Sequence, residues 1–295
     1  MIRYLNQGKG KGPGVGAAAP MKSDLYSVAG AAKILEGAMV PNIVQTGDGM
    51  IRYGGYGAMK HQLNALNGNR SGSVFAETFS MMLESSISTT EVLGDILDAT
   101  ALSAADTFSS PKGGLVSAQL REVAKLIKMD TVDRQMERAG FVVSQRGYDT
   151  HNSFDLDSLM SQLDSGLRSF ATEMKAQDRW NNVTVVLISD FGRTLTSNTQ
   201  GTDHGWGGQY FMLGGDVKGG RMVGQFPARL LEEESDVSIG RGRILPTTPW
   251  EAVWSGIAEW WDITEPAARA YILPNAQNWL PEELYNRTHL FKRQE

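Results

Sequence analysis

Hydrophobic residues in the middle of the chain recur in a strand, helix, strand order. Phe141, Val142 and Val143 form a short apolar run that predicts a buried strand. The segment 154–177 carries apolar residues three and four positions apart, which predicts a helix of about six turns. The run from Val183 to Ile188 is apolar and β-branched, and it gives the strongest strand signal in the chain.

This order predicts a right-handed crossover that joins two parallel strands of one sheet. The loops that follow the two strands, GYDTH and SDFGRT, then open at the same sheet edge, where α/β proteins bind their ligands. A further strand is expected from Tyr210 to Leu213, and the motif GTDHG precedes it. The pattern therefore predicts an α/β fold with three polar loops near one edge.

Shorter patterns predict the elements on either side of this unit. Short β-like pieces alternate with turn signals from Asp24 to about Tyr56. The stretch from Ser73 to Leu97 predicts one or two helices, with a break at the β-branched SISTT and methionines that fill the core. Apolar residues from Ser117 line one face of a helix that ends near Met129.

A helix start is well specified toward the C-terminus. Thr248 and Glu251 form a T-x-x-E capping box, and Pro249 occupies the first helical position. The apolar residues that follow have helical spacing, which favours a core-facing helix over an aromatic sugar-binding platform. They are Trp250, Val253, Trp254, Ile257, Trp260 and Trp261.

Composition excludes several classes of protein. The net charge of −5, without a basic stripe, argues against nucleic-acid binding. No apolar run approaches the roughly 20 residues of a membrane span. Because the chain has no cysteine, disulfides and thiolate ligands are absent and metal ligands must come from oxygen and imidazole donors. Residues 1–20, rich in glycine and lysine and without an export signal's apolar stretch, are expected to form a flexible arm before one domain, 21–295.

Acidic residues and histidines gather in the three loops. Asp149 and His151 lie in GYDTH, Asp190 in SDFGRT, and Asp203 and His204 in GTDHG, so two of the four histidines are there. Divalent cations prefer carboxylate and imidazole ligands, and a binuclear site needs about six such side chains. Arg193, three residues after Asp190, offers a planar fork for an oxyanion. The loops therefore predict a metal or phosphate site.

Each residue also has a simpler interpretation. Asp149 alone is typical of a helix cap, Asp190 of a turn, and Arg193 of a surface cation. His61 and His289 have no acidic loop beside them and are interpreted as ordinary polar residues. Three acidic loops at predicted strand ends are hard to obtain from independent caps, and this coincidence favours the joint site.

These motifs, together with VTVVLISDFGRT, LGGDVKGG and RGRILPTTPW, resemble the signature set of the family called domain of unknown function 1501. That family is placed in the alkaline-phosphatase and sulfatase-like superfamily. The resemblance runs from about residue 26 to 280 and is strongest over 147–220. It implies a three-layer α/β sandwich with a mainly parallel sheet, and a hydrolase that cleaves phosphate or sulfate esters, of small molecules or polysaccharides, with divalent Zn, Mn or Ca ions.

By position, the resemblance makes Asp149, His151 and His204 ligands of one metal and Asp190 a ligand of a second, with Asp203 beside them. Family members resemble exported bacterial proteins, which implies an extracellular location. They also begin with a strand carrying GG-x-D and a region that supplies a nucleophile, and neither is recognisable in this chain. Ser189 and Thr194 lie near the right loop, but no nucleophile is assigned.

The expected domain therefore lacks its N-terminal strand region and needs a missing segment or a partner chain for activity. Two alternatives remain open. One is a non-catalytic structural or carbohydrate-binding protein that keeps the fold. The other is a mononuclear site in which Asp149, His151 and His204 hold one ion.

Overall fold

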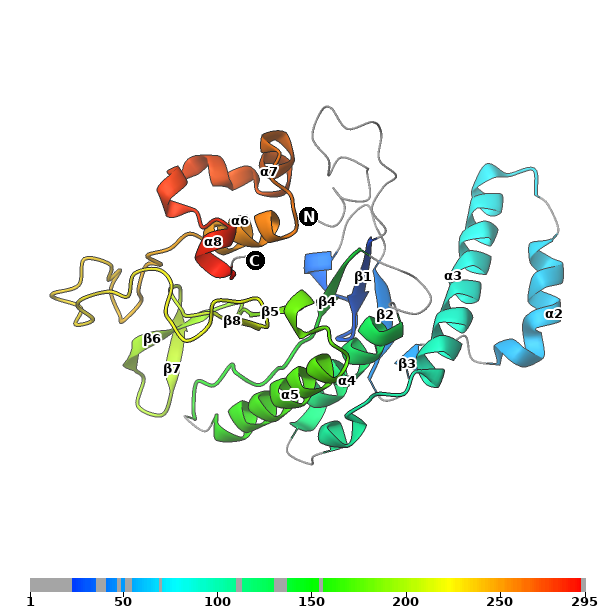
Figure 1. Ribbon diagram of the computed structural model, residues 1–295, viewed down its shortest axis with the longest axis horizontal. Coiled ribbons are helices and arrows are strands. Elements are labelled where there is room, and N and C mark those ends of the chain that lie inside the picture. The colour runs from blue at the N-terminus through cyan, green and yellow to red at the C-terminus, as the bar shows by residue number, and fades with distance from the viewer. Residues whose placement is uncertain are drawn as a thin grey trace. The chain divides into compact units, whose positions relative to one another are not determined.

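A computed structural model describes residues 23–35, 41–46, 49–50, 55–68, 71–109, 113–129, 137–153 and 156–292 (Figure 1). The flexible arm predicted for residues 1–20 lies outside these described residues. The chain divides into two compact units. One comprises Asp24–Gln145 and Ser165–Glu173, and the other comprises Arg146–Asp164 and Met174–Glu295 together with Met1–Ser23.

The first unit contains a four-stranded sheet in the order β3-β2-β1-β4. β1 pairs with β2 in parallel, and β2 pairs with β3 antiparallel. The strands are β1 (Ser23–Ser27), β2 (Asn42–Gln45), β3 (Gly49–Met50) and β4 (Arg138–Val142). The short β-like pieces predicted after Asp24 are thus confirmed, and the strand predicted at Phe141 begins three residues earlier.

Helices accompany this sheet in the same unit. The Gln119 side chain of α4 donates to the Ser144 carbonyl at 2.9 Å and accepts from its N–H at 2.8 Å, which fixes α4 to the segment after β4. α4 confirms the helix predicted to end near Met129. The helices are η1 (Lys33–Leu35), α2 (Tyr56–Asn67), α3 (Val74–Ala99), η2 (Ala105–Ser109) and α4 (Gly114–Met129).

α3 corrects two expectations. It is one continuous helix of 26 residues, so the predicted break at SISTT is wrong. Each β-branched residue costs a helix only about half a kcal/mol, and Ile87, Leu93 and Leu97 within and after this stretch are buried. The methionines are not core filler, since Met81 and Met82 are exposed. Propensity at SISTT is therefore outweighed by packing of the C-terminal half of α3.

The second unit includes the loop that begins at Arg146, after β4, and it contains two small antiparallel pairs of strands. β5 pairs with β8, and β6 pairs with β7. After α5 (Asp157–Ala176), which the division of the chain splits, come η5 (Trp180–Asn182), β5 (Thr184–Leu187), β6 (Gly192–Ser197), β7 (Thr202–Gly205) and β8 (Phe211–Gly214). The helix and the two strands predicted at 154–177, Val183–Ile188 and Tyr210–Leu213 are confirmed.

The predicted crossover is wrong, because β4 and β5 belong to different sheets and β5 takes β8 as an antiparallel partner. A strand, helix, strand order fixes the elements but not the hydrogen-bond partner of either strand. GTDHG also differs from expectation: Thr202–Gly205 form β7 itself, paired with β6, and are not a loop at the end of a parallel strand. An α/β fold is confirmed, while these pairings do not form a mainly parallel sheet.

Helices complete the second unit. The predicted capping box does not form: α6 begins at Trp250, and the Thr248 hydroxyl lies 3.4 Å from that of Tyr285. α6 packs against α8 through Ile257, Leu290 and Phe291, but Trp250 at its start is exposed. The elements are α6 (Trp250–Trp260), α7 (Pro266–Ile272), η6 (Pro274–Asn278), η7 (Pro281–Glu283) and α8 (Arg287–Leu290). None of the described helices has the length and apolar character required to traverse a bilayer.

Candidate metal centre

The β6–β7 hairpin carries one part of the site. Its register pairs Arg193 with His204, so both residues lie at the same level of the hairpin. The ring of Phe191, just before β6, stacks on the His204 imidazole with centroids 3.9 Å apart and planes within 6°. This stacking fixes the plane of the His204 imidazole. His204 lies on β7, and its partner strand β6 is close to it in sequence.

Arg193 attaches the loop 147–151 to this hairpin. Its guanidinium donates to the Thr202 carbonyl at 2.6 Å and to the Tyr148 carbonyl at 2.5 Å. The same group lies 4.9 Å from the centre of the Phe191 ring. Two of its N–H groups are thus used to join two segments. The predicted contact of Arg193 with an oxyanion stays a prediction for its remaining N–H groups.

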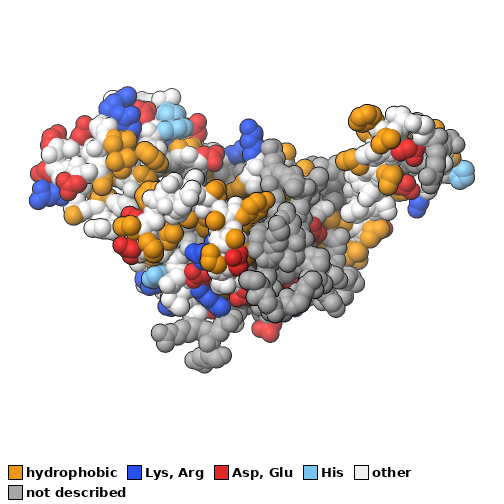
Figure 2. All heavy atoms as spheres, turned by 90° about the horizontal axis from the view of Figure 1, so that it is seen from above, with side chains coloured by type: hydrophobic (Ala, Val, Ile, Leu, Met, Phe, Trp, Pro, Cys, Tyr) orange, Lys and Arg blue, Asp and Glu red, His pale blue; other side chains and the backbone are white. Residues whose placement is uncertain are grey.

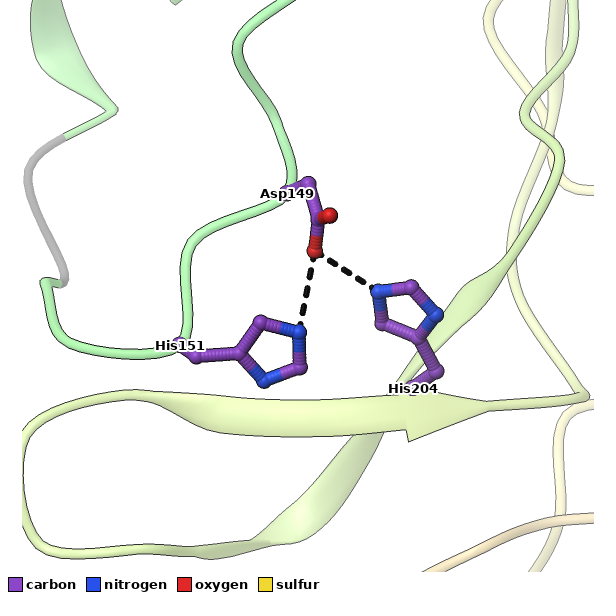
Figure 3. Close-up of side chains that lie close together, drawn as sticks. All are labelled: Asp149, His151 and His204. Atoms are coloured by element: carbon purple, nitrogen blue, oxygen red, sulfur yellow. Dashed lines mark hydrogen bonds and ion pairs between the residues drawn. The ribbon is translucent and has the colours of Figure 1, made fainter.

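Asp149, His151 and His204 converge in one cluster (Figure 3). The Oδ1 atom of Asp149 lies 2.8 Å from Nε2 of His204 and 3.0 Å from Nε2 of His151. One ligand atom from each of the three residues lies within 4.8 Å of the other two. The three side chains are each between 43% and 62% exposed, so the cluster is open to solvent.

The cluster lowers the pKa of the Asp149 carboxyl below its ordinary value. The largest cause is the hydrogen bond from His204, and the charges of His204, His151 and Arg193 act in the same direction. The Asp149 carboxylate therefore stays ionised as the pH falls below the ordinary range of an aspartate. An ionised carboxylate beside two imidazoles is a set of donors that divalent cations bind.

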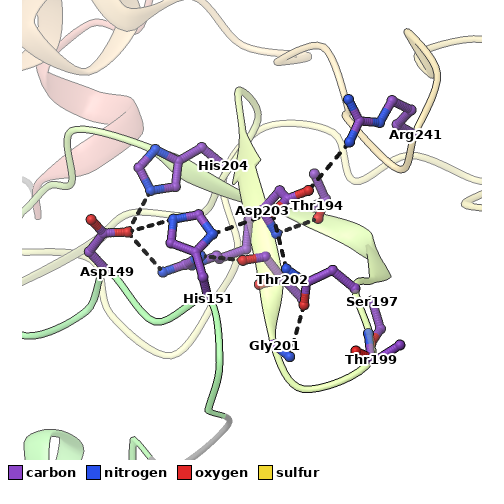
Figure 4. Close-up of polar contacts among 12 residues, drawn as sticks. Asp149, His151, Thr194, Ser197, Thr199, Gly201, Thr202, Asp203, His204 and Arg241 are labelled. Atoms are coloured by element: carbon purple, nitrogen blue, oxygen red, sulfur yellow. Dashed lines mark hydrogen bonds and ion pairs between the residues drawn. The ribbon is translucent and has the colours of Figure 1, made fainter.

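Asp203 lies behind His151 (Figure 4). Its Oδ1 atom is 3.3 Å from Nδ1 of His151 and accepts from the Asn198 amide at 3.1 Å. Arg241 lies 3.5 Å from the other oxygen. With Nδ1 of His151 facing a carboxylate, Nε2 is the nitrogen that faces Asp149. This arrangement matches metal sites in which an outer carboxylate orients a ligating histidine.

The structure does not bring Asp190 into this cluster. Its side chain is exposed in the bend between β5 and β6, and within the described part of the chain its carboxylate makes no hydrogen bond or ion pair. Thr194 is buried, and its hydroxyl donates to the Thr196 carbonyl and accepts from the Asp203 N–H. Ser189 is exposed, and its hydroxyl accepts from the Phe191 N–H at 3.5 Å. Neither hydroxyl contacts the cluster.

Sequence patterns did not predict three residues that lie around the cluster. Phe191 lies in SDFGRT, but an aromatic residue in this loop gives no local signal that its ring stacks on His204. Arg241 opens the motif RGRILPTTPW, but a motif without acidic or imidazole side chains predicts no contact with Asp203. Asn198 lies in the turn of the β6–β7 hairpin and carries no local signal beyond turn chemistry.

The donor set fits one tetrahedral ion. Metal-to-nitrogen and metal-to-oxygen distances near 2 Å place neighbouring tetrahedral ligands about 3.3 Å apart. The separations of Asp149 Oδ1 from the two Nε2 atoms, 2.8 Å and 3.0 Å, are slightly shorter than this spacing, and one ligand atom of each residue lies within 4.8 Å of the other two. Three protein ligands with an open fourth position are typical of a catalytic site, whereas structural sites have four.

Comparison with protein families gives a match over residues 62–239 to the model described as protein of unknown function, DUF1501. The matched segment contains the loop 147–151 and the β6–β7 hairpin, and so all three residues of the cluster. Searches of curated proteins and of solved structures give no match. Since the match covers more than half of the 295 residues, the chain belongs to the DUF1501 family of proteins of unknown function.

Proposed function

We propose that the chain binds a divalent cation through Asp149, His151 and His204 and acts as a metal-dependent hydrolase of phosphate or sulfate esters. The observation that carries the proposal is the convergence of one carboxylate oxygen and two imidazole nitrogens within 4.8 Å. Zn, Mn and Ca are the candidate ions, and Zn fits two imidazoles and one carboxylate best. The substrate is a small-molecule or polysaccharide ester.

A bound divalent ion polarises an ester oxygen and helps a water molecule to ionise at neutral pH. The residues of this chain then have separate tasks. Asp149 and the two Nε2 atoms hold the ion, and Asp203 keeps Nδ1 of His151 turned away from it. Arg193 holds the Asp149 loop against the hairpin, and its Nη2 atom, which donates to the Tyr148 carbonyl, lies 3.8 Å from Oδ1 of Asp149. Exposed ligands leave room for a substrate.

The finer parts of the proposal follow the family resemblance. A second ion would use Asp190 with ligands from an additional segment, and the same segment would supply the nucleophile. That segment would also complete a three-layer sandwich. It would come from a partner chain, and the protein would be exported.

Metal content and esterase activity test the proposal together. Purified protein is expected to retain one Zn per chain after gel filtration, measured by elemental mass spectrometry, and to hydrolyse p-nitrophenyl phosphate or p-nitrophenyl sulfate with the metal-activated water as nucleophile. Asp149→Ala and His204→Ala should abolish both properties. His61→Ala, on the exposed surface of α2, is the matched control and should change neither. Zinc retained by Asp149→Ala would refute the site.

Asp190→Ala separates a one-ion centre from a two-ion centre. Because the Asp190 carboxylate lies outside the cluster, the variant should keep one ion per chain. A protein that starts with two ions and loses one in Asp190→Ala would show the binuclear site that the resemblance implies.

The second candidate is a non-catalytic carbohydrate-binding protein, and exposed aromatic rings favour it. Trp206, Tyr210 and Trp250 are all at least 45% exposed, and the Tyr210 and Trp250 rings meet edge to face at 5.6 Å. Such rings stack on sugars. A metal-free, inert protein whose tryptophan fluorescence responds to soluble polysaccharide, with loss of the response in Trp206→Ala, would support this function instead.

A further inference from the structure

An apolar face runs along the exposed side of α3. Six large hydrophobic side chains on this helix are between 58% and 89% exposed: Val74, Phe75, Phe79, Met81, Met82 and Val92. Figure 2 shows hydrophobic side chains gathered over the part of the first unit formed by α2 and α3. Single exposed hydrophobic residues are ordinary, but a contiguous group on one helix marks an interaction surface.

The six residues share one side of the helix. At 100° per residue they fall within a sector of roughly 160°. Between residues 74 and 89 the other positions in this sector are small and uncharged, and the charged residues Glu77, Glu84 and Glu91 repeat every seven positions on the opposite side. Further along the helix the same sector holds Leu93 and Leu97, which are buried in the first unit. The small residues are Thr78, Ser85, Ser86 and Thr89. The α3 face, defined by these ten residues, therefore carries no charge.

The size of the α3 face is that of a protein interface. Taking about 150–200 Å² for each fully exposed large side chain, the six residues leave roughly 700 Å² of apolar surface in water. The largest apolar patch of a typical monomer is about 300–600 Å². A standard interface buries about 800 Å² on each partner. The α3 face is thus larger than a monomer usually exposes and close to what one side of a stable dimer requires.

We propose that the α3 face is the interface with a second copy of this chain, in an antiparallel pair of α3 helices around a two-fold axis. The face has no charge with which to recognise a charged partner, and an uncharged, self-complementary surface is what an isologous dimer requires. The three glutamates lie away from the contact, so pairing brings no like charges together.

Side-chain sizes along the α3 face complement one another in this antiparallel pair. Phe75 and Phe79 lie toward its start, and Ser85, Ser86 and Thr89 lie toward its end. With the axis near Met82, the Phe79 ring of one copy faces Ser85 of the other, and Phe75 faces Thr89. Large side chains then meet small ones, which is how helix interfaces interdigitate. A parallel pair would instead place phenylalanine against phenylalanine and serine against serine.

Sedimentation velocity on the full chain tests the dimer. The protein is expected to sediment as a dimer at tens of micromolar. In the double variant Phe75→Glu/Phe79→Glu, the dimer dissociation constant should rise by roughly tenfold or more, because a charge is then buried at the centre of the interface. Phe226→Glu is the matched control, since Phe226 is also more than half exposed but lies in the other unit. The control should remain dimeric.

Cross-linking tests the geometry without disturbing the interface. The chain has no cysteine, so Ser85→Cys introduces a single thiol near the proposed axis. Glu84→Cys places the thiol on the opposite side of α3 and is its neighbouring control. A short bismaleimide should join two copies of Ser85→Cys and not of Glu84→Cys. A monomer at every concentration, or equal cross-linking of the two variants, would overturn the proposal.

Discussion

At the scale of single residues, the candidate metal centre depends on a close backbone contact. Gly201, in the turn of the β6–β7 hairpin, is buried, and a Cβ atom there would overlap the carbonyl of His151. The absence of a side chain at Gly201 therefore lets the loop that carries Asp149 and His151 lie against the hairpin that carries His204. The presence of histidine and aspartate in these loops does not by itself produce this backbone contact.

Gly201→Ala is expected to weaken metal binding while the fold is kept. The added methyl group must push the His151 backbone away from the hairpin, which separates His151 from His204 and lowers zinc affinity by roughly tenfold to a hundredfold, as loss of ligand orientation does. Zinc titration by calorimetry measures the change. Gly208→Ala, where the nearest atom is 3.7 Å from the new Cβ, should bind zinc as the wild type does. Equal affinities for both variants would show that the contact is unimportant.

At the scale of elements, α4 is stabilised by its apolar face despite a buried acid. Glu122 is only 3% exposed, and its Oε2 atom has no hydrogen-bond partner among the described residues, with Lys125 Nζ at 3.6 Å. Burial raises the pKa of the Glu122 carboxyl, and the charges of Lys125 and Arg121 only partly oppose this. The unfolded chain therefore ionises Glu122 more easily than the folded chain does.

Glu122→Gln is expected to stabilise the protein at neutral pH and not in acid. When the folded pKa exceeds the unfolded pKa, stability falls as the pH rises from the unfolded value through the folded value. The variant lacks this loss, so at pH 7 its free energy of unfolding should exceed that of the wild type by about 1 kcal/mol, the scale of an unsatisfied buried polar group.

Urea unfolding at pH 7 and at pH 4 measures this difference, which should shrink at the lower pH. Glu84→Gln, at an exposed position of α3, is the control and should change stability by less than about 0.5 kcal/mol at either pH. A destabilised Glu122→Gln at pH 7 would mean that the Lys125 interaction outweighs the cost of burial.

At the scale of the whole molecule, the division into two units separates the proposed functions. The metal cluster lies in the unit formed by 146–164 and 174–295, and the α3 face lies in the other unit. A ligand that binds only the folded state stabilises the part that it binds. Metal binding and dimerisation should therefore act on different segments of the chain.

Hydrogen exchange with and without zinc is expected to show this separation. At 100 times its dissociation constant, zinc stabilises the bound unit by about 2.7 kcal/mol. Amides of the 147–151 loop and of the β6–β7 hairpin should exchange more slowly with zinc than with a chelator, while those of α4 should be unchanged. Equal protection of α4 would indicate that the two units unfold together.

The sequence alone determined most of the helices and strands and the kinds of side chain at the site. The helical spacing of apolar residues predicted α4 and α5, and short apolar runs predicted β5 and β8. Both signals come from the local geometry of the backbone. The concentration of histidine and aspartate in the three loops predicted five candidate ligands, of which Asp149, His151 and His204 lie together.

Only the tertiary structure decided which strands pair and which acids meet. β5 could pair with any strand whose edge it reached, and it pairs antiparallel with β8, the strand that follows the β6–β7 hairpin. The same hairpin turns His204 toward Asp149, places Asp203 behind His151 and leaves Asp190 outside. Strand pairing and side-chain convergence are long-range contacts between segments, and no local period encodes them.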